Sequence, residues 1–269
     1  MVFVFSASAK TKIGIKLRVR FLGTGTSQGI PVIACPCEVC HSPDHHDQRL
    51  RSSVLLEWRG LSLVIDCGPD FRQQMLQARV RKLDAVLLTH GHKDHTGGLD
   101  DVRSFNFLQK KAMPVYANAE VLEDIRREFS YIFAKNRYPG VPKLELIRIN
   151  NEPFYLQDTL IQPLLVFHGS MPVYGFRIGG FAYITDASAI PGETIALLEG
   201  IDTLVLNALR KEKHPTHFNL EEAIRMAGQL KAGRTYLTHI GHLMGRSKEV
   251  GAALPPNVFL AYDGLEISL

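Results

Sequence analysis

Three histidines and one aspartate lie close together at His90, His92, Asp94 and His95. Imidazole and carboxylate groups bind zinc, manganese or iron at neutral pH, so this spacing indicates a metal site. The cluster follows the apolar run at residues 84–88, which is typical of a buried strand. In extended backbone His90 and His92 point the same way, whereas Asp94 and His95 diverge. One segment is therefore predicted to supply ligands to two adjacent metal ions.

A cluster on one strand cannot complete two metal sites, so other strand ends must contribute ligands. Three candidates each follow a strand-like run further along the chain: His168, Asp186 and His239. A polar side chain at the end of a buried strand needs either a hydrogen-bond partner or a metal ion. Taken singly, each is more typical of a hydrogen-bonded polar residue. Together with the first cluster, they favour the metal site.

The elements that position these residues follow a simple order. Strands are predicted at residues 17–22, 54–58, 61–65, 84–89, 114–117, 144–149, 160–167, 174–178, 181–185, 203–206, 235–238 and within 258–268, and helices at 71–78, 101–109, 119–129, 191–198 and 220–230. Two halves of strands followed by helices predict an α/β (α+β) fold with two sheets packed face to face and helices outside. We expect one four-layer domain over residues 17–269, preceded by a frayed leader at residues 1–16.

Composition narrows the class of protein. The chain has 269 residues, of which 45% are hydrophobic and 22% charged, as in an ordinary globular protein. No apolar stretch reaches the roughly 18 residues needed to cross a bilayer, so no membrane partner is expected. The net charge of +4 is spread along the chain, which tolerates an anionic substrate but is too weak to favour nucleic acid.

A second cluster contains three of the four cysteines, Cys35, Cys37 and Cys40. Cysteines this close cannot form a disulfide framework, but they suit thiolate ligation of zinc in a reducing compartment, which predicts a cytoplasmic location. A closed structural zinc site needs four ligands. The sequence leaves the fourth open among five candidates: His41, His45, His46, Cys67 and His242.

The ligand pattern from His90 to His239 resembles that of the metallo-β-lactamase superfamily, and the resemblance runs from about Leu17 to the C-terminus. It implies an αββα sandwich with two zinc or manganese ions at the top of the sheets. By this resemblance one ion binds His90, His92 and His168, the other binds Asp94, His95 and His239, and Asp186 bridges them. A bridging carboxylate is typical of the branch that hydrolyses phosphoesters.

The turn at residues 23–31, the cysteine cluster and the spacing His239-x-x-His242 resemble the phosphodiesterase family of the carbon–phosphorus lyase pathway. That resemblance implies a structural zinc ion held by Cys35, Cys37, Cys40 and His242. It also assigns proton donation to His217, before the helix at residues 220–230. The cysteine cluster alone is less specific, because a protein of pyrroloquinoline quinone biosynthesis resembles it too.

These features together predict a dinuclear hydrolase that cleaves a small or cyclic phosphodiester with a metal-bridging hydroxide. His217 and Asp94 are the catalytic candidates; Asp66 either orients a ligand histidine or caps a turn, and His214 is expected to be solvated. Partners are a small-molecule substrate and, as one option, a second copy in a homodimer. The alternatives are a tRNA 3′-processing endonuclease, a lactonase or thioesterase, and a metal-stabilised accessory protein without turnover.

Overall fold

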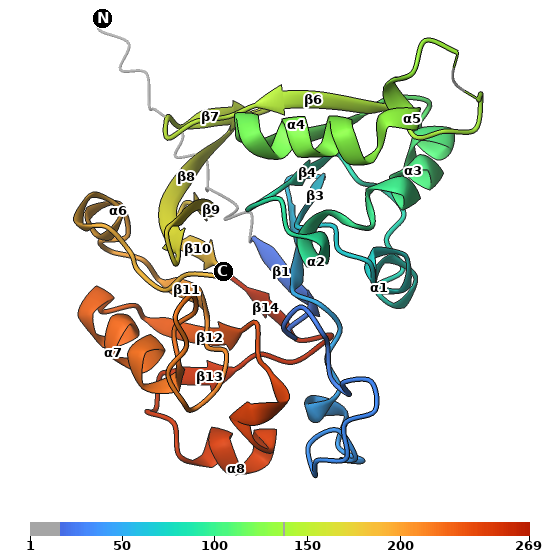
Figure 1. The fold of residues 1–269 in the computed structure, drawn as a ribbon. Coiled ribbons are helices and arrows are strands. Elements are labelled where there is room, and N and C mark those ends of the chain that lie inside the picture. Colours follow the sequence, from blue (N-terminus) through green and yellow to red (C-terminus); the bar gives the residue numbers. More distant parts are fainter. Residues whose placement is uncertain (1–16, 137) are drawn as a thin grey trace, which may run out of the picture.

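Two twisted sheets pack face to face in the computed structural model, which describes residues 17–136 and 138–269 (Figure 1). The expected leader at residues 1–16 lies outside the described residues. The first sheet contains β1 (Arg18–Gly23), β2 (Ser53–Trp58), β3 (Leu61–Ile65), β4 (Ala85–Leu87), β5 (Met113–Ala117), β6 (Leu144–Arg148) and β14 (Glu266–Ser268). The second contains β7 (Phe154–Leu156), β8 (Thr159–His168), β9 (Met171–Ile178), β10 (Phe181–Ile184), β11 (Thr203–Asn207), β12 (Arg234–Thr238) and β13 (Val258–Leu260).

Each sheet changes from antiparallel to parallel pairing along its width. In the first sheet β14, β1, β2 and β3 pair antiparallel, and β3 to β6 pair parallel. In the second, β7 to β10 pair antiparallel and β10 to β13 pair parallel. Because parallel strands end at the same edge of a sheet, side chains that follow β4, β10 and β12 are brought to one rim of the sandwich.

Helices cover both outer faces, as Figure 1 shows. They are α1 (Phe71–Gln77), α2 (Lys93–Thr96), α3 (Arg103–Gln109), α4 (Ala119–Glu128), α5 (Ser130–Phe133), α6 (Gly192–Leu197), α7 (Leu220–Leu230) and α8 (Ser247–Ala252), with short 3-10 turns at η1 (His45–Asp47), η2 (Leu99–Val102) and η3 (His242–Met244). α7 begins at a capping box in which the Asn219 side chain and Glu222 satisfy each other's backbone N–H groups. The predicted αββα architecture is confirmed. Among the described residues, no helix is both long and apolar enough to span a membrane.

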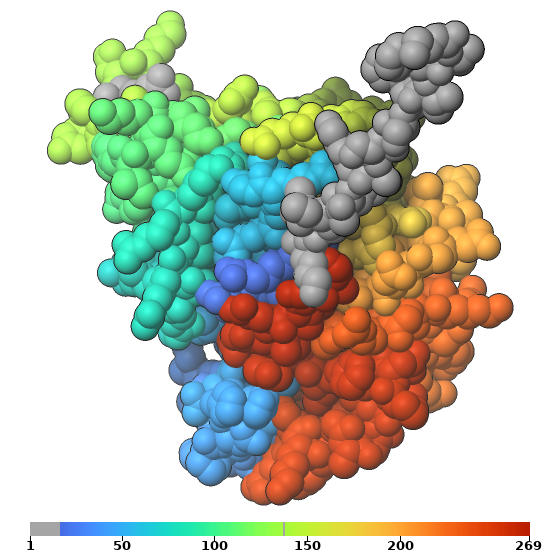
Figure 2. Space-filling model, turned by 180° about the vertical axis from the view of Figure 1, so that it is seen from behind, coloured from blue at the N-terminus to red at the C-terminus, as the bar shows by residue number. Residues whose placement is uncertain are grey.

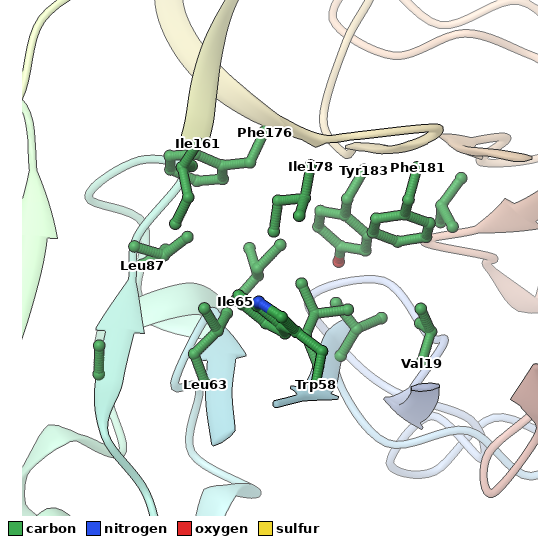
Figure 3. Packing of buried hydrophobic residues seen from close by; sticks show 14 of the residues in the cluster. Val19, Trp58, Leu63, Ile65, Leu87, Ile161, Phe176, Ile178, Phe181 and Tyr183 are labelled. Carbon is green, nitrogen blue, oxygen red and sulfur yellow. The ribbon is translucent and has the colours of Figure 1, made fainter. Parts of the chain in front are cut away.

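The core between the sheets consists of alternate side chains from each inner face. Ile65 and Leu87 of the first sheet face Ile161 and Phe176 of the second, and all four are fully buried (Figure 3). Burying an aliphatic or phenyl side chain of this size contributes roughly 1.5–3 kcal/mol. Separate apolar clusters lie between each sheet and its helices, so the four layers have three contiguous cores that hold the rim in place.

A buried polar network ties the segment before β2 to the C-terminal turn. The Arg49 guanidinium donates to the Thr24 hydroxyl (2.6 Å) and to the carbonyl oxygen of Ala261 (2.5 Å). The Asp263 carboxylate accepts from the Thr24 hydroxyl (2.7 Å) and from the Leu50 N–H (2.6 Å). Figure 2 shows the light-blue segment before β2 lying against the red C-terminal part of the chain at this end of the molecule. The network thus joins residues 24, 49 and 50 to residues 261 and 263, which are far apart in the sequence.

We expect Asp263→Asn to change how stability depends on pH. Burial raises the pKa of Asp263 to about 6 from its ordinary 3.8, so between these values the folded chain holds a proton that the unfolded chain has released. The stabilisation from this carboxyl is therefore complete below pH 3.8 and is lost as the pH rises through about 6. Between about pH 4.5 and about pH 7.5 the loss amounts to about 2 kcal/mol.

Urea unfolding of both proteins at these two pH values measures the effect. The free energy of unfolding of the wild type, minus that of the Asp263→Asn variant, should fall by this amount as the pH rises. Parallel pH dependence of the two proteins would show that Asp263 does not titrate in this range.

Candidate metal centre

The histidine cluster lies where β4 gives way to a short helix. His90 is buried in the loop after β4, and His92 is the N-cap residue of α2, with extended backbone angles. The expected extended geometry ends there, because residues from Lys93 onward are helical. Asp94 and His95 therefore converge instead of diverging, and His95 Nε2 lies 3.1 Å from Asp94 Oδ2.

The distal candidates also lie at strand ends on the same rim. His168 is the last residue of β8, Asp186 follows β10 by two residues, and His239 comes directly after β12. Asp186 and His239 have positive φ angles of 56° and 55°, and Asp66, after β3, has 66°. The left-handed region costs a non-glycine residue roughly 1–3 kcal/mol and is concentrated at functional sites. The backbone is thus strained at three positions that turn side chains toward the rim.

The predicted ligand atoms come together at this rim. Three overlapping groups have their ligand atoms within 4.8 Å of one another: His90, His95 and Asp186; Asp94, His95 and His239; and His168, Asp186 and His217. His92 lies beside them, with its Nδ1 atom 3.0 Å from His90 Nε2 and its ring 5.3 Å from that of His168. The structure therefore gathers all seven predicted residues, and Asp186 belongs to two of the three groups.

The carboxylates and imidazoles at the rim shift one another's pKa values. Burial opposes charge on His95, but Asp66, Asp186 and Asp94 outweigh it and raise the pKa of His95 well above its ordinary value. Burial likewise opposes ionisation of Asp186, yet His239 and His95 hold its pKa well below the usual range. Asp94 has a lowered pKa because the same two histidines outweigh its burial. Carboxylates this acidic, facing imidazoles, form a ready site for divalent metal ions.

Several buried nitrogen atoms at the rim have no hydrogen-bond partner among the described residues. They are His95 Nε2, His217 Nδ1 and both ring nitrogens of His239. His95 Nε2 and His239 Nε2 lie 3.3 and 3.2 Å from Asp186 oxygens, close together but without hydrogen-bond geometry. Buried polar atoms are normally satisfied, so such a convergence is the arrangement expected of metal ligands. The residues present fit divalent metal ions.

Neighbouring groups fix the orientation of the ligand histidines. His95 Nδ1 lies 2.7 Å from the buried Asp66 carboxylate, which also accepts from the Thr89 N–H at 2.9 Å. His168 donates from Nδ1 to the carbonyl oxygen of Thr216 at 2.7 Å. Each contact occupies Nδ1 and leaves Nε2 directed at the rim, as is usual for metal-binding histidines. Of the two roles considered for Asp66, the geometry favours orientation of a ligand.

His217 and His214 extend the cluster outward. The His217 ring stacks on that of His239 at 4.9 Å, and its Nδ1 lies 3.7 Å from Asp186. The His214 ring lies 5.1 Å from His217, on the more exposed side. His214 is half-exposed, so the expectation that it is solvated holds in part, but its place beside His217 was not expected. Sequence reasoning missed it because the adjacent charged residues at 210–213 resemble an ordinary surface turn, although the His-x-x-His spacing with His217 was a usable signal.

Of the five candidates for the fourth ligand of the cysteine cluster, His242 is the one that lies against the three sulfur atoms. His242 Nδ1 lies 3.2 Å from Cys35 Sγ, 3.4 Å from Cys37 Sγ and 3.7 Å from Cys40 Sγ. The backbone N–H of Cys40 lowers the pKa of Cys37 to about 6, whereas burial raises the pKa of Cys40 to about 11. Three sulfurs around one imidazole nitrogen match the donor set of a structural zinc site. Cys67 lies elsewhere as a buried free thiol.

The other candidate residues lie outside these two clusters. His45 and His46 form a separate group with Asp44, and His41 Nδ1 lies 3.1 Å from the carbonyl oxygen of Cys37. Arg103, a basic residue near the N-terminus of α3, pairs with Asp100 at 3.1 Å. Arg210 donates to the carbonyl oxygens of Glu212 and Lys213. It remains close enough to His214 to act on it electrostatically: burial, then Arg210, lowers the pKa of His214.

Comparison with known proteins gives a family match over the centre of the chain. The model of the "Beta-lactamase superfamily domain" matches residues 62–240. A crystal structure described as a new diphosphatase from the PhnP family is 40% identical, with a TM-score of 0.89, and the match covers 94% of this chain and 97% of that one. Zn²⁺-bound PqqB from Methylobacterium extorquens shares the fold, with 22% identity, a TM-score of 0.77 and coverage of 94% and 100%.

Two curated relatives match over part of their length. An octanoyltransferase of Porphyromonas gingivalis is 43% identical over 253 residues, which cover 93% of this chain and 51% of that protein. A ribonuclease Z of a Bradyrhizobium species is 33% identical over 106 residues, covering 38% of this chain and 34% of that protein. The chain spans about half or less of the length of these relatives, and their named activities describe those whole proteins.

Replacing Asp66 by Asn should weaken metal binding without unfolding the chain. Asn tolerates the positive φ angle of this position, but the Thr89 N–H and His95 Nδ1 contact different carboxylate oxygens of Asp66, so an amide that accepts from one of them presents its NH₂ group to the other. Loss of such a supporting contact typically lowers metal affinity by roughly 10–100-fold. Competition with a chromophoric zinc chelator measures the change.

Asp84→Asn is the matched control, because Asp84 accepts from the Ser62 N–H just before β4, at the end opposite the rim. Equal zinc affinity in Asp66→Asn and the control would contradict the role given to Asp66.

Proposed function

The chain belongs to the metallo-β-lactamase superfamily of hydrolases, and we propose that it cleaves phosphodiester bonds with a pair of divalent metal ions. The observation that carries this proposal is the convergence of the seven predicted ligands on one rim, with a buried carboxylate, Asp186, between two groups of them. Two divalent ions held by these residues would suit in-line displacement at phosphorus, because both the attacking and the leaving oxygen need stabilisation. The relation to a PhnP-family diphosphatase supports phosphorus chemistry.

We assign the ligands in two sets around Asp186. His90, His92 and His168 would hold one ion, and Asp94, His95 and His239 the other. The bound ions would supply the chemistry of the centre by lowering the pKa of water to about 7 and by neutralising phosphoryl charge. The chain's own residues then hold the ligands in place, exclude bulk water from the rim and provide a proton for the leaving group.

His217 is the proposed proton donor. It is 8% exposed and stacks on His239, so it lies at the border between the metal centre and solvent. Burial, followed by the neighbouring His239, lowers the pKa of His217 to about 3. An anionic phosphoryl group bound beside the ring raises this pKa again, because opposite charge favours the imidazolium form. His217 is thus protonated when substrate is bound, and it can then donate this proton to the leaving oxygen.

A diphosphate bond is the second candidate target. The relative that supports it is the PhnP-family diphosphatase, which aligns with nearly the whole of both chains. A P–O–P bond and a phosphodiester need the same two ions, but they differ in the leaving group. A leaving phosphate needs less protonation than a leaving alkoxide, so the dependence of the rate on His217 separates the two substrates.

His92→Ala should abolish hydrolysis of bis(p-nitrophenyl) phosphate. His92 contributes a ligand atom at the edge of the cluster, and its removal opens one of the two proposed metal positions. We expect kcat to fall by at least about 100-fold, measured as p-nitrophenolate release by zinc- or manganese-loaded protein. Full activity of this variant would contradict the proposal. So would cleavage of precursor tRNA by a wild-type protein that leaves small phosphodiesters intact.

His217→Ala should affect substrates in proportion to the basicity of their leaving group. With an alkyl leaving group kcat should fall by about 100- to 10,000-fold, the usual contribution of a positioned acid. With p-nitrophenolate, which leaves without protonation, the loss should be far smaller. His45→Ala, in which a side chain 74% exposed is removed, serves as the control. An equal loss for both leaving groups would show that His217 is not the proton donor.

A further inference from the structure

His214 occupies the outer end of a row of three imidazole rings. The row begins at His239, which is buried, and passes to His217 at a ring distance of 4.9 Å. It continues to His214 at 5.1 Å, where the chain is half-exposed. The three rings therefore lead from a proposed metal ligand, through the proposed proton donor, to a half-exposed side chain.

Hydrogen bonds to Thr216 fix both the position and the tautomer of His214. The backbone N–H of Thr216 donates to His214 Nδ1 at 3.3 Å, and the Thr216 hydroxyl lies 3.2 Å from the same atom. An N–H group can only donate, so Nδ1 carries a lone pair and the ring proton sits on Nε2. The carbonyl oxygen of the same Thr216 accepts from His168. One residue thus ties His214 to a proposed metal ligand.

The loop that carries His214 is held at several points. The Phe218 N–H donates to the carbonyl oxygen of Ala187 (2.7 Å), immediately after Asp186. The Leu220 N–H donates to the carbonyl oxygen of Arg210 at 2.9 Å. His214 therefore stands at a fixed place relative to the metal centre. Within the part of the chain that the structure describes, its Nε2–H has no protein acceptor, which leaves one N–H donor available beside the His217 ring.

We propose that His214 binds a non-bridging phosphoryl oxygen of the substrate through its Nε2–H. This assignment rests on the proposed phosphodiesterase function and adds a residue that recognises the anion. The His214 ring lies beside that of His217, the proposed proton donor, and the nearby Arg210 adds positive charge. His214 is a binding residue and His217 a proton donor, so the two histidines affect different kinetic constants.

Two substitutions of His214 distinguish the role of Nδ1 from that of Nε2. In His214→Asn the amide oxygen stands near Nδ1 and can accept the Thr216 N–H, but no donor reaches the place of Nε2. In His214→Gln the longer side chain brings an amide N–H near the place of Nε2. His45→Asn, at an exposed position, is the control. Thermal unfolding and metal content show that each variant is folded and loaded.

The probe is inorganic phosphate, titrated calorimetrically into the zinc-loaded proteins. His214→Asn should bind phosphate at least about tenfold more weakly, because it loses a hydrogen bond to a charged group. In bis(p-nitrophenyl) phosphate hydrolysis its KM should rise to a similar degree while kcat changes less than about threefold. His214→Gln should restore most of the phosphate affinity.

Three results would overturn the assignment. The first is a wild-type protein that binds no phosphate, and the second is a His214→Asn variant with unchanged phosphate affinity and KM. The third is a loss in His214→Asn that grows with the basicity of the leaving group, since this identifies a proton donor. Phosphate binding that depends on His214, in a protein that hydrolyses no phosphodiester, would uphold the anion site while rejecting the proposed function.

Discussion

The structure depends on one electrostatic constraint, the convergence of buried carboxylates and imidazoles at a single rim. Ionised groups in a protein interior cost several kcal/mol each unless they are paired or bind a metal. Asp94 and Asp186 are held ionised by His95 and His239, whose Nε2 atoms have no hydrogen-bond partner among the described residues. Apolar packing between the sheets cannot relieve this conflict, whereas divalent cations can. The proposed chemistry follows from this need of the buried carboxylates and imidazoles for bound cations.

Surrounding residues turn this constraint into a defined geometry. Asp66 holds His95, and the carbonyl oxygen of Thr216 holds His168, so ligand orientation depends on elements from both sheets. The loop after β12 contributes His239 to the rim and, three residues later, His242 to the cysteine cluster. A structural zinc at the cysteines would therefore brace the same loop that supplies a catalytic ligand. The backbone at Asp66, Asp186 and His239 has positive φ angles, a strained conformation that is concentrated at functional sites.

Strand and helix periodicity predicted the two sheets and most of the helices, because buried strands and amphipathic helices leave clear patterns. The short helix α2 was not predicted, since four residues carry no periodicity, and so the divergence expected for Asp94 and His95 was wrong. The predicted ligands come together because strand ends on a parallel sheet share an edge. The partners of His214 could not be predicted, as they depend on backbone groups of Thr216 that fold against β8.

The number of metal ions bound per chain tests the central claim most directly. Native mass spectrometry of the zinc-loaded protein counts them, and His92→Ala and Cys37→Ala report on the two clusters separately. The structure predicts three ions in the wild type, two at the rim and one at the cysteines, with loss of an ion from the corresponding cluster in each variant. A single ion, retained in His92→Ala and lost in Cys37→Ala, would contradict a dinuclear hydrolase and indicate a metal-stabilised protein without turnover.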